Sequence, residues 1–120
     1  MKALIVDDND CLRHLYKLYL QDMDFETDEA PNGKEAFSLL ERSDYDVILS
    51  DIEMPAVNGM ELYKMVNAHK PHLLARFVFA TGDSLDGMHQ HFFSAIDCPV
   101  LTKPFSFDDL QHTIARVAAR

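Results

Sequence analysis

Short runs of apolar residues alternate along this chain with segments of helical periodicity, and this alternation limits the possible folds more than any other feature. Four runs are nearly continuous in apolar residues and finish on a polar side chain: 3–7 (ALIVD), 46–51 (DVILSD), 76–81 (RFVFAT) and 99–103 (PVLTK). Such runs are typical of strands in a parallel sheet that is covered on both faces. A weaker, alternating run at 25–30 (FETDEA) indicates an edge strand.

The segments between these runs carry apolar residues at helical spacing. The i, i+3, i+4 pattern is clearest over residues 12–23; shorter versions cover 33–42, 62–66 and 110–117, and the least clear covers 85–96. Asn-Gly pairs precede two of them, at 32–33 and 58–59, and we interpret these pairs as helix starts because no strand pattern follows. Strand and helix therefore alternate five times. This order predicts an α/β fold, a doubly wound (βα)5 domain around one five-stranded parallel sheet with right-handed crossovers.

Bulk composition narrows the classes of protein. A length of 120 residues fits one domain, residues 1–120. The net charge of −9 argues against direct nucleic-acid binding, because phosphate contacts need clustered Lys and Arg. Cys11 and Cys98 match no metal-binding spacing, and no apolar run reaches the ~18 residues of a membrane span. We therefore expect a cytoplasmic protein with reduced thiols that does not insert into a membrane.

Polar side chains finish the predicted strands. Asp7 and Asp8 end the first, Asp51 the third, Thr81 the fourth and Lys103 the fifth. In a doubly wound sheet, ligands bind beyond the carboxyl ends of the strands, so these side chains are expected at one edge. Each has a structural explanation when taken alone, such as a helix cap, a loop residue, a strand former or a solvated charge. Their repetition at the same edge favours a functional site.

The predicted residue set has a definite chemistry. Two carboxylates ~4 Å apart repel by about 4 kcal/mol at an effective dielectric constant of 20, so three of them favour protonation or a bound cation. Oxygen ligands of this kind suit Mg²⁺. With Mg²⁺ beside it, Asp51 becomes a suitable acceptor for a phosphoryl group, while Lys103 and the Thr81 hydroxyl stabilise the transferring oxygens.

Four segments carry a resemblance to a known family. LIVDDN (4–9), VILSDIEMPAVNGMEL (47–62), FATG (79–82) and LTKPF (101–105) resemble the signature segments of response-regulator receiver domains, the phosphoacceptor modules of two-component and phosphorelay signalling. The resemblance implies a flavodoxin-like strand order 2-1-3-4-5. It also implies a histidine kinase or phosphotransfer protein as phosphodonor and a downstream protein as target. The implied activity is limited to self-catalysed phosphoryl uptake and loss, so we do not expect an enzyme.

The resemblance also implies roles for individual residues. Asp51 accepts the phosphoryl group and is a metal ligand, Asp8 binds Mg²⁺ directly, Asp7 acts mainly through water, and the Glu53 backbone carbonyl supplies a further ligand. A cis peptide is implied at 103–104.

The chain departs from the family at one informative position. Val100 stands three residues before the lysine, where the family usually has an aromatic residue that turns inward on activation. We therefore expect the output to pass through residues 82–88 and the neighbouring helix. Glu53 and Asp83 resemble positions that tune the lifetime of the phosphoryl group. Because both are acidic, we expect them to slow labelling by small anionic phosphodonors and to increase the dependence on Mg²⁺.

Two other functions fit parts of the sequence. A haloacid-dehalogenase-like phosphohydrolase also uses a strand-end Asp followed two residues later by an acid, as at Asp51 and Glu53. That family, however, expects its acidic pair near the C-terminal end and a cap or longer core, whereas here the pair is at residues 7–8 and the chain has 120 residues. A pseudo-receiver that only binds partners is disfavoured by the intact set of Asp8, Asp51, Thr81 and Lys103.

Overall fold

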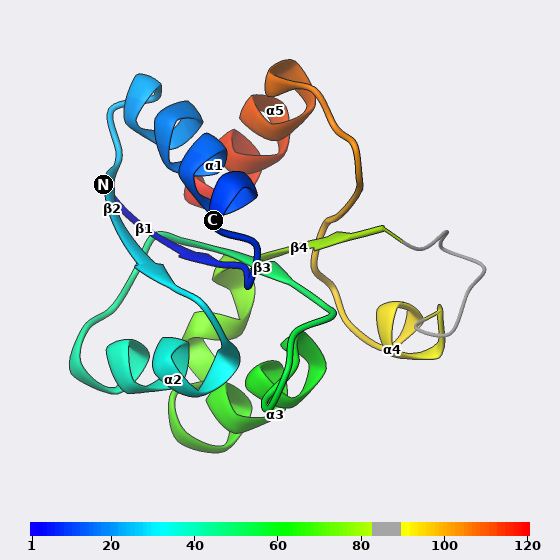
Figure 1. Ribbon diagram of the computed structural model, residues 1–120. Helices are drawn as coiled ribbons and strands as arrows, with labels where there is room; N and C mark the ends of the chain where they lie inside the picture. Colours follow the sequence, from blue (N-terminus) through cyan, green and yellow to red (C-terminus); the bar gives the residue numbers. More distant parts are fainter. Residues whose placement is uncertain (83–89) are drawn as a thin grey trace.

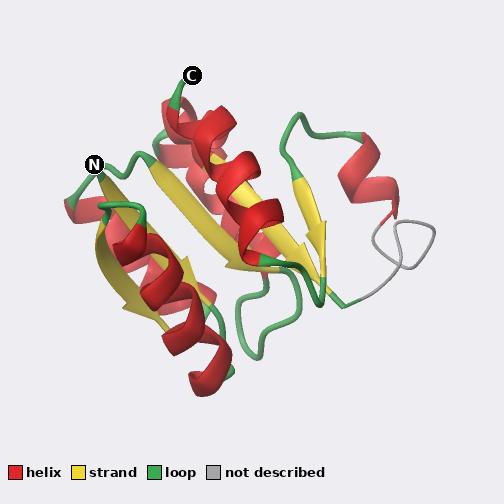
Figure 2. Cartoon of the chain, turned by 90° about the horizontal axis from the view of Figure 1, so that it is seen from above, coloured by secondary structure: helices red, strands yellow, loops and turns green. Residues whose placement is uncertain are grey.

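Five parallel strands form the middle layer of the molecule. The computed structural model describes residues 1–82 and 90–120, and its strands are β1 (Lys2–Val6), β2 (Glu26–Ala30), β3 (Val47–Asp51), β4 (Phe77–Thr81) and β5 (Val100–Thr102). They lie in the order β2-β1-β3-β4-β5, every neighbouring pair is parallel, and the arrows of the sheet point the same way (Figure 2). The predicted fold class and the strand order implied by the resemblance are confirmed, as is the edge position of β2.

Helices cover both faces of this sheet. In Figure 1, α1 (Asp10–Asp22) and α5 (Phe107–Ala118) lie on one side, and α2 (Gly33–Arg42) and α3 (Gly59–His69) lie on the other. A short helix α4 (Gln90–Ser94) lies beyond β4, and a 3-10 helix η1 (Pro71–Arg76) precedes β4. No helix within residues 1–82 and 90–120 is both long enough and apolar enough to cross a membrane.

Alternate residues of the same strand supply two separate hydrophobic cores. In β1, Ala3 and Ile5 pack with α1 and α5, whereas Leu4 and Val6 pack with α2 and α3. Successive side chains of a strand point to opposite faces, so a continuous apolar run is what two covered faces require. This explains why the runs in β1, β3 and β4 carried so clear a signal.

Helix starts follow the Asn residues that the sequence marks. The Asn32 and Asn58 side chains each accept a hydrogen bond from the backbone N–H three residues later, and Asn9 does the same for α1. The interpretation of both Asn-Gly pairs as helix starts is therefore correct.

Some element bounds differ from the predictions. The helix predicted at 85–96 is present as Gln90–Ser94, and residues 85–89 lie outside the described part of the chain. Before β4, Pro71 starts a 3-10 helix, in the helix-opening position that proline favours. Strands β1 and β5 end one residue earlier than expected, so Asp7 and Lys103 lie just outside the sheet.

Candidate functional site

Polar residues from four strand ends meet at one edge of the sheet. Asp51 and Thr81 are the last residues of β3 and β4, while Asp7 and Lys103 directly follow β1 and β5. Asp7, Asp51 and Thr81 are buried, with 2%, 8% and 0% of their surface exposed. The Lys103 Nζ lies 3.3 Å from Asp7 Oδ2 and 3.2 Å from Asp51 Oδ2. One ammonium therefore joins two buried carboxylates from distant parts of the chain.

Asp7 is fixed through its backbone as well as its side chain. Its N–H donates to the Ala30 carbonyl at 3.2 Å, and its Oδ1 accepts from the Asn9 N–H at 2.9 Å. Its other carboxylate oxygen faces Lys103. A carboxylate held in this way has little freedom to reorient toward a ligand, which suits a supporting role beside a more exposed neighbour.

That neighbour is Asp8, which is exposed. Asp7, Asp8 and Asp51 each offer a carboxylate oxygen, and these oxygens all lie within 4.8 Å of one another. A group of three carboxylate oxygens, one of them at the open side, fits Mg²⁺, which prefers oxygen ligands and keeps several of its waters. The donor set is therefore compatible with the metal that the resemblance implies.

Asp8 also lines an open groove of about 410 Å³ outside the cluster. The groove opens beside Asp8, and Glu53 lines it too. The Glu53 side chain is exposed, so its charge faces whatever enters. Asp83, the other acidic position that we expected to tune the site, lies outside the described residues, as does most of the 82–88 segment.

The electrostatics of Asp51 reflect its burial. Loss of water raises the pKa of the Asp51 carboxyl above its ordinary value, and the charge of Asp7 raises it further. Lys103 opposes both effects, and the Glu53 backbone N–H contributes a smaller opposing hydrogen bond. The ionised carboxylate is thus incompletely compensated by the protein, and an additional cation at this place would stabilise it.

A backbone hydrogen bond to β4 holds Lys103 in place. Its N–H donates to the Thr81 carbonyl at 2.7 Å, which ties the lysine to the strand that carries the threonine. The Lys103-Pro104 peptide is cis, as the resemblance implies. Thr81 itself is fully buried at the end of β4, beside the pair of residues that Lys103 joins.

Tyr16 supports the same loop from α1, a role that sequence reasoning missed. Its ring stacks on Phe105 with the centroids 5.2 Å apart, and Phe105 lies two residues after Lys103. Burial raises the pKa of the Tyr16 hydroxyl, and the charges of Asp7 and Asp51 raise it further, so the hydroxyl stays protonated. The sequence showed Tyr16 only as one position of an amphipathic helix.

Gly59 is a second residue whose importance the sequence did not reveal. A Cβ at this position would lie 2.4 Å from the Asp51 carbonyl oxygen, and the Gly59 N–H donates to the Ile52 carbonyl at 2.9 Å. The N-terminus of α3 therefore rests directly on the backbone that carries Asp51. The Asn-Gly pair was a visible signal, but it indicated only a helix start.

Comparison with known proteins identifies the class of domain. A family model described as the response regulator receiver domain matches residues 3–115. The transcriptional regulatory protein SrrA of Staphylococcus aureus is 36% identical over 105 residues, which cover 88% of this chain and 42% of SrrA. The chain thus spans less than half the length of this curated relative.

Solved structures agree with the family match. The chemotaxis protein CheY4 of Vibrio cholerae is 30% identical, with a TM-score of 0.86 over 97% of each chain. The response regulator TrrA of Thermotoga maritima, solved in complex with Mg²⁺ and BeF, is 31% identical, with a TM-score of 0.82 over 97% of each chain.

Proposed function

Because the chain belongs to the response-regulator receiver domain family of two-component systems, we propose that it accepts a phosphoryl group on Asp51. The proposed donor is a phosphohistidine on a histidine kinase or phosphotransfer protein. The observation that carries the proposal is the position of Asp51, which is buried at the strand end, paired with Lys103 and grouped with the carboxylates of Asp7 and Asp8.

The proposed reaction is an in-line displacement at phosphorus. An Asp51 carboxylate oxygen forms the new P–O bond while the P–N bond of the phosphohistidine breaks, and the imidazole nitrogen leaves with the electron pair. The reverse change of state is hydrolysis, in which water attacks the phosphorus and releases inorganic phosphate and the free carboxylate. We propose that the protein catalyses only these two steps on itself and is not an enzyme for an outside substrate.

The chain's own residues favour the transfer by position and charge. The Lys103 ammonium, already 3.2 Å from the carboxylate, offsets negative charge on the transferring oxygens, and the Thr81 hydroxyl lies at the adjoining strand end to donate to one of them. Bound Mg²⁺ would supply further positive charge at the same oxygens.

We propose that the phosphorylated protein changes its affinity for a downstream protein. The new dianion lies beside the end of β4, so any rearrangement there passes to the residues that follow Thr81. SrrA is a transcriptional regulator, which offers one precedent for such an output. The net charge of −9 disfavours DNA as the direct partner of this domain.

The test is Mg²⁺-dependent labelling by phosphoramidate, read by intact-protein mass spectrometry. We expect one label per chain in the wild type, none in Asp51→Asn, and normal labelling in Asp22→Asn, an exposed acid at the far end of α1. A wild type that takes no label would favour the pseudo-receiver. Sustained turnover of a phosphate ester would favour the phosphohydrolase.

A further inference from the structure

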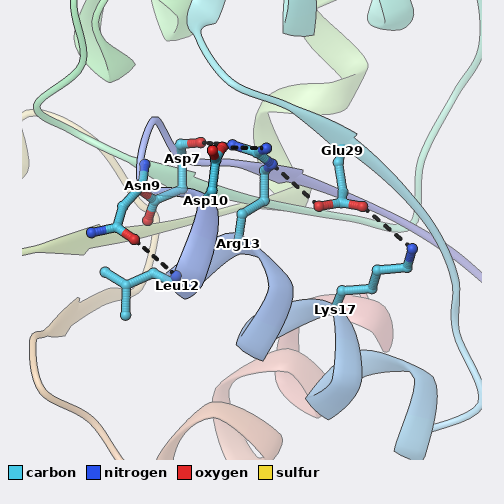
Figure 3. Close-up of polar contacts among 7 residues, drawn as sticks. All are labelled: Asp7, Asn9, Asp10, Leu12, Arg13, Lys17 and Glu29. Atoms are coloured by element: carbon cyan, nitrogen blue, oxygen red, sulfur yellow. Dashed lines mark hydrogen bonds and ion pairs between the residues drawn. The ribbon is translucent and has the colours of Figure 1, made fainter.

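The Arg13 guanidinium connects three elements around the loop that follows β1. Figure 3 shows it between the start of α1 and Glu29 on β2. Its Nη1 donates to the Asp7 carbonyl at 2.8 Å, its Nη2 to Asp10 Oδ1 at 2.7 Å, and its Nε to Glu29 Oε1 at 3.2 Å. Only 17% of the side chain is exposed, so its position is well defined by these contacts.

The contact with the Asp7 carbonyl matters most for the site. That carbonyl belongs to the peptide that links Asp7 to Asp8, and a peptide unit is planar. Holding its oxygen therefore fixes the direction in which the chain enters Asp8. Because Asp7 is already held through its N–H and both carboxylate oxygens, Arg13 completes the support on the side of Asp8.

Two carboxylates beside Arg13 reduce the repulsion between its guanidinium and a cation bound at the site. A guanidinium near three carboxylates would by itself weaken the binding of another positive ion. Asp10 and Glu29 each place a carboxylate oxygen on the guanidinium and offset its charge. Arg13 can therefore donate its hydrogen bond to the Asp7 carbonyl, while its positive charge has less effect on a cation at the site.

We infer that Arg13 is a positioning residue for divalent-cation binding, acting through the Asp7 carbonyl on the orientation of Asp8. The role of the metal in this inference rests on the proposed function, but the affinity of the protein for Mg²⁺ can be measured without phosphorylation. Substitution of a residue that orients a metal ligand typically lowers the metal affinity by about ten- to hundredfold. We therefore expect Arg13→Gln to weaken Mg²⁺ binding about tenfold.

The matched control is Lys17→Gln. Lys17 lies one turn further along α1 and pairs with the same carboxylate, at 3.4 Å from Glu29 Oε2. Within the described residues, Arg13 donates to the Asp7 carbonyl and Lys17 does not. Both substitutions remove one positive charge near the acidic cluster, and loss of charge alone should tighten cation binding. If Arg13 acts by position, the Mg²⁺ affinity should therefore fall in Arg13→Gln and rise in Lys17→Gln.

The experiment is calorimetric titration of the full chain with MgCl₂, with thermal unfolding in the absence of metal as the check on folding. Arg13→Gln binding as tightly as Lys17→Gln would overturn the inference. Arg13→Lys provides a second variant that keeps the charge but cannot span three acceptors; we expect about threefold to tenfold weaker binding. Wild-type affinity in that variant would also overturn the inference.

Labelling with phosphoramidate then separates this inference from the proposed function. At saturating Mg²⁺ we expect Arg13→Gln to reach the wild-type labelling rate, because only the metal requirement has changed. A rate that stays low at saturation would place the effect of Arg13 on the acceptor and contradict the inference. Absence of label in the wild type would refute the proposed function and leave the affinity comparison standing.

Discussion

The Lys103 ammonium lies 3.2 Å from a carboxylate oxygen of Asp51, although Asp51 ends β3, Lys103 follows β5, and most of the second half of the chain separates them. The contact is nearly dry, with 19% of the lysine side chain and 9% of the aspartate side chain exposed. A buried pair of this kind adds little net stability, since desolvation consumes most of the attraction. Under the proposed function, its value lies in holding both groups where a phosphoryl group would be transferred.

Asp51→Asn should make the protein more stable at neutral pH. Burial raises the pKa of the Asp51 carboxyl above 3.8, so the folded protein holds this proton at pH values where the unfolded chain has lost it. The associated stability is present below pH 3.8 and is lost as the pH rises through the folded value. Lys103 keeps Asp7 as its partner in the variant. We expect a gain of about 1 kcal/mol at neutral pH.

Urea denaturation between about pH 4 and about pH 8 measures this effect. The advantage of Asp51→Asn should shrink as the pH falls, because the wild-type carboxyl becomes neutral too. A variant less stable than the wild type at neutral pH would show that the ion pair with Lys103 outweighs the cost of burying the charge.

Mg²⁺ should stabilise the fold through the carboxylate cluster. A ligand at a hundred times its Kd adds about 2.7 kcal/mol to the free energy of unfolding. We expect most of this gain to disappear in Asp8→Asn, because Asp8 supplies the cluster oxygen at the open side, and to persist in Asp22→Asn. Thermal unfolding with and without MgCl₂ is the measurement. Equal responses in both variants would mean that the metal binds elsewhere.

Gly59→Ala should destabilise the protein while Gly82→Ala is tolerated. The new Cβ at position 59 would lie 2.4 Å from the Asp51 carbonyl oxygen, so α3 or β3 must move. At position 82, no atom of the described residues comes within 4 Å of a built Cβ. We expect a loss of about 2 kcal/mol or more for the first and about 0.5 kcal/mol or less for the second, measured by urea denaturation. Similar values for both would contradict the close packing of α3 on β3.

Glu53→Asn should speed labelling by small anionic phosphodonors. The Glu53 side chain is exposed in the groove that leads to Asp8 and repels an incoming phosphate group. We expect labelling by phosphoramidate to become about threefold faster and to need less Mg²⁺. Glu41→Gln, which removes an exposed charge from α2, is the control and should change neither property. If the labelling rate of Glu53→Asn equalled that of the wild type, Glu53 would have no role in tuning the site.

Val100→Tyr should not restore an aromatic switch. Val100 lies opposite Phe79 in the β4–β5 register, and the Phe92 ring lies 5.6 Å from that of Phe79. Rings already occupy this side of the sheet, so we expect overpacking that costs about 1–3 kcal/mol. Partner capture with and without beryllofluoride should show no large gain over Val100→Ile. A large gain would mean that the pathway lacks only its aromatic residue.

The sequence by itself determined the architecture and the edge at which the chemistry gathers. Continuous apolar runs specify strands buried on both faces, and helical spacing between them specifies the crossovers. Once the strands are parallel, the residues that finish them must lie at the same edge, which is why Asp7, Asp51, Thr81 and Lys103 could be grouped in advance. The strand order came from the family resemblance, since periodicity carries no information about which strands are neighbours.

Only the tertiary structure decided how the site is supported. Periodicity records whether a side chain is buried, but it does not record the distance to a residue elsewhere in the chain. The approach of Gly59 to the Asp51 backbone and the stacking of Tyr16 on Phe105 depend on how helices settle against the sheet. The reach of Arg13 to the Asp7 carbonyl and Glu29 depends on the place of α1 beside β2. These contacts are set by packing between elements, so they appear only when the whole chain is folded.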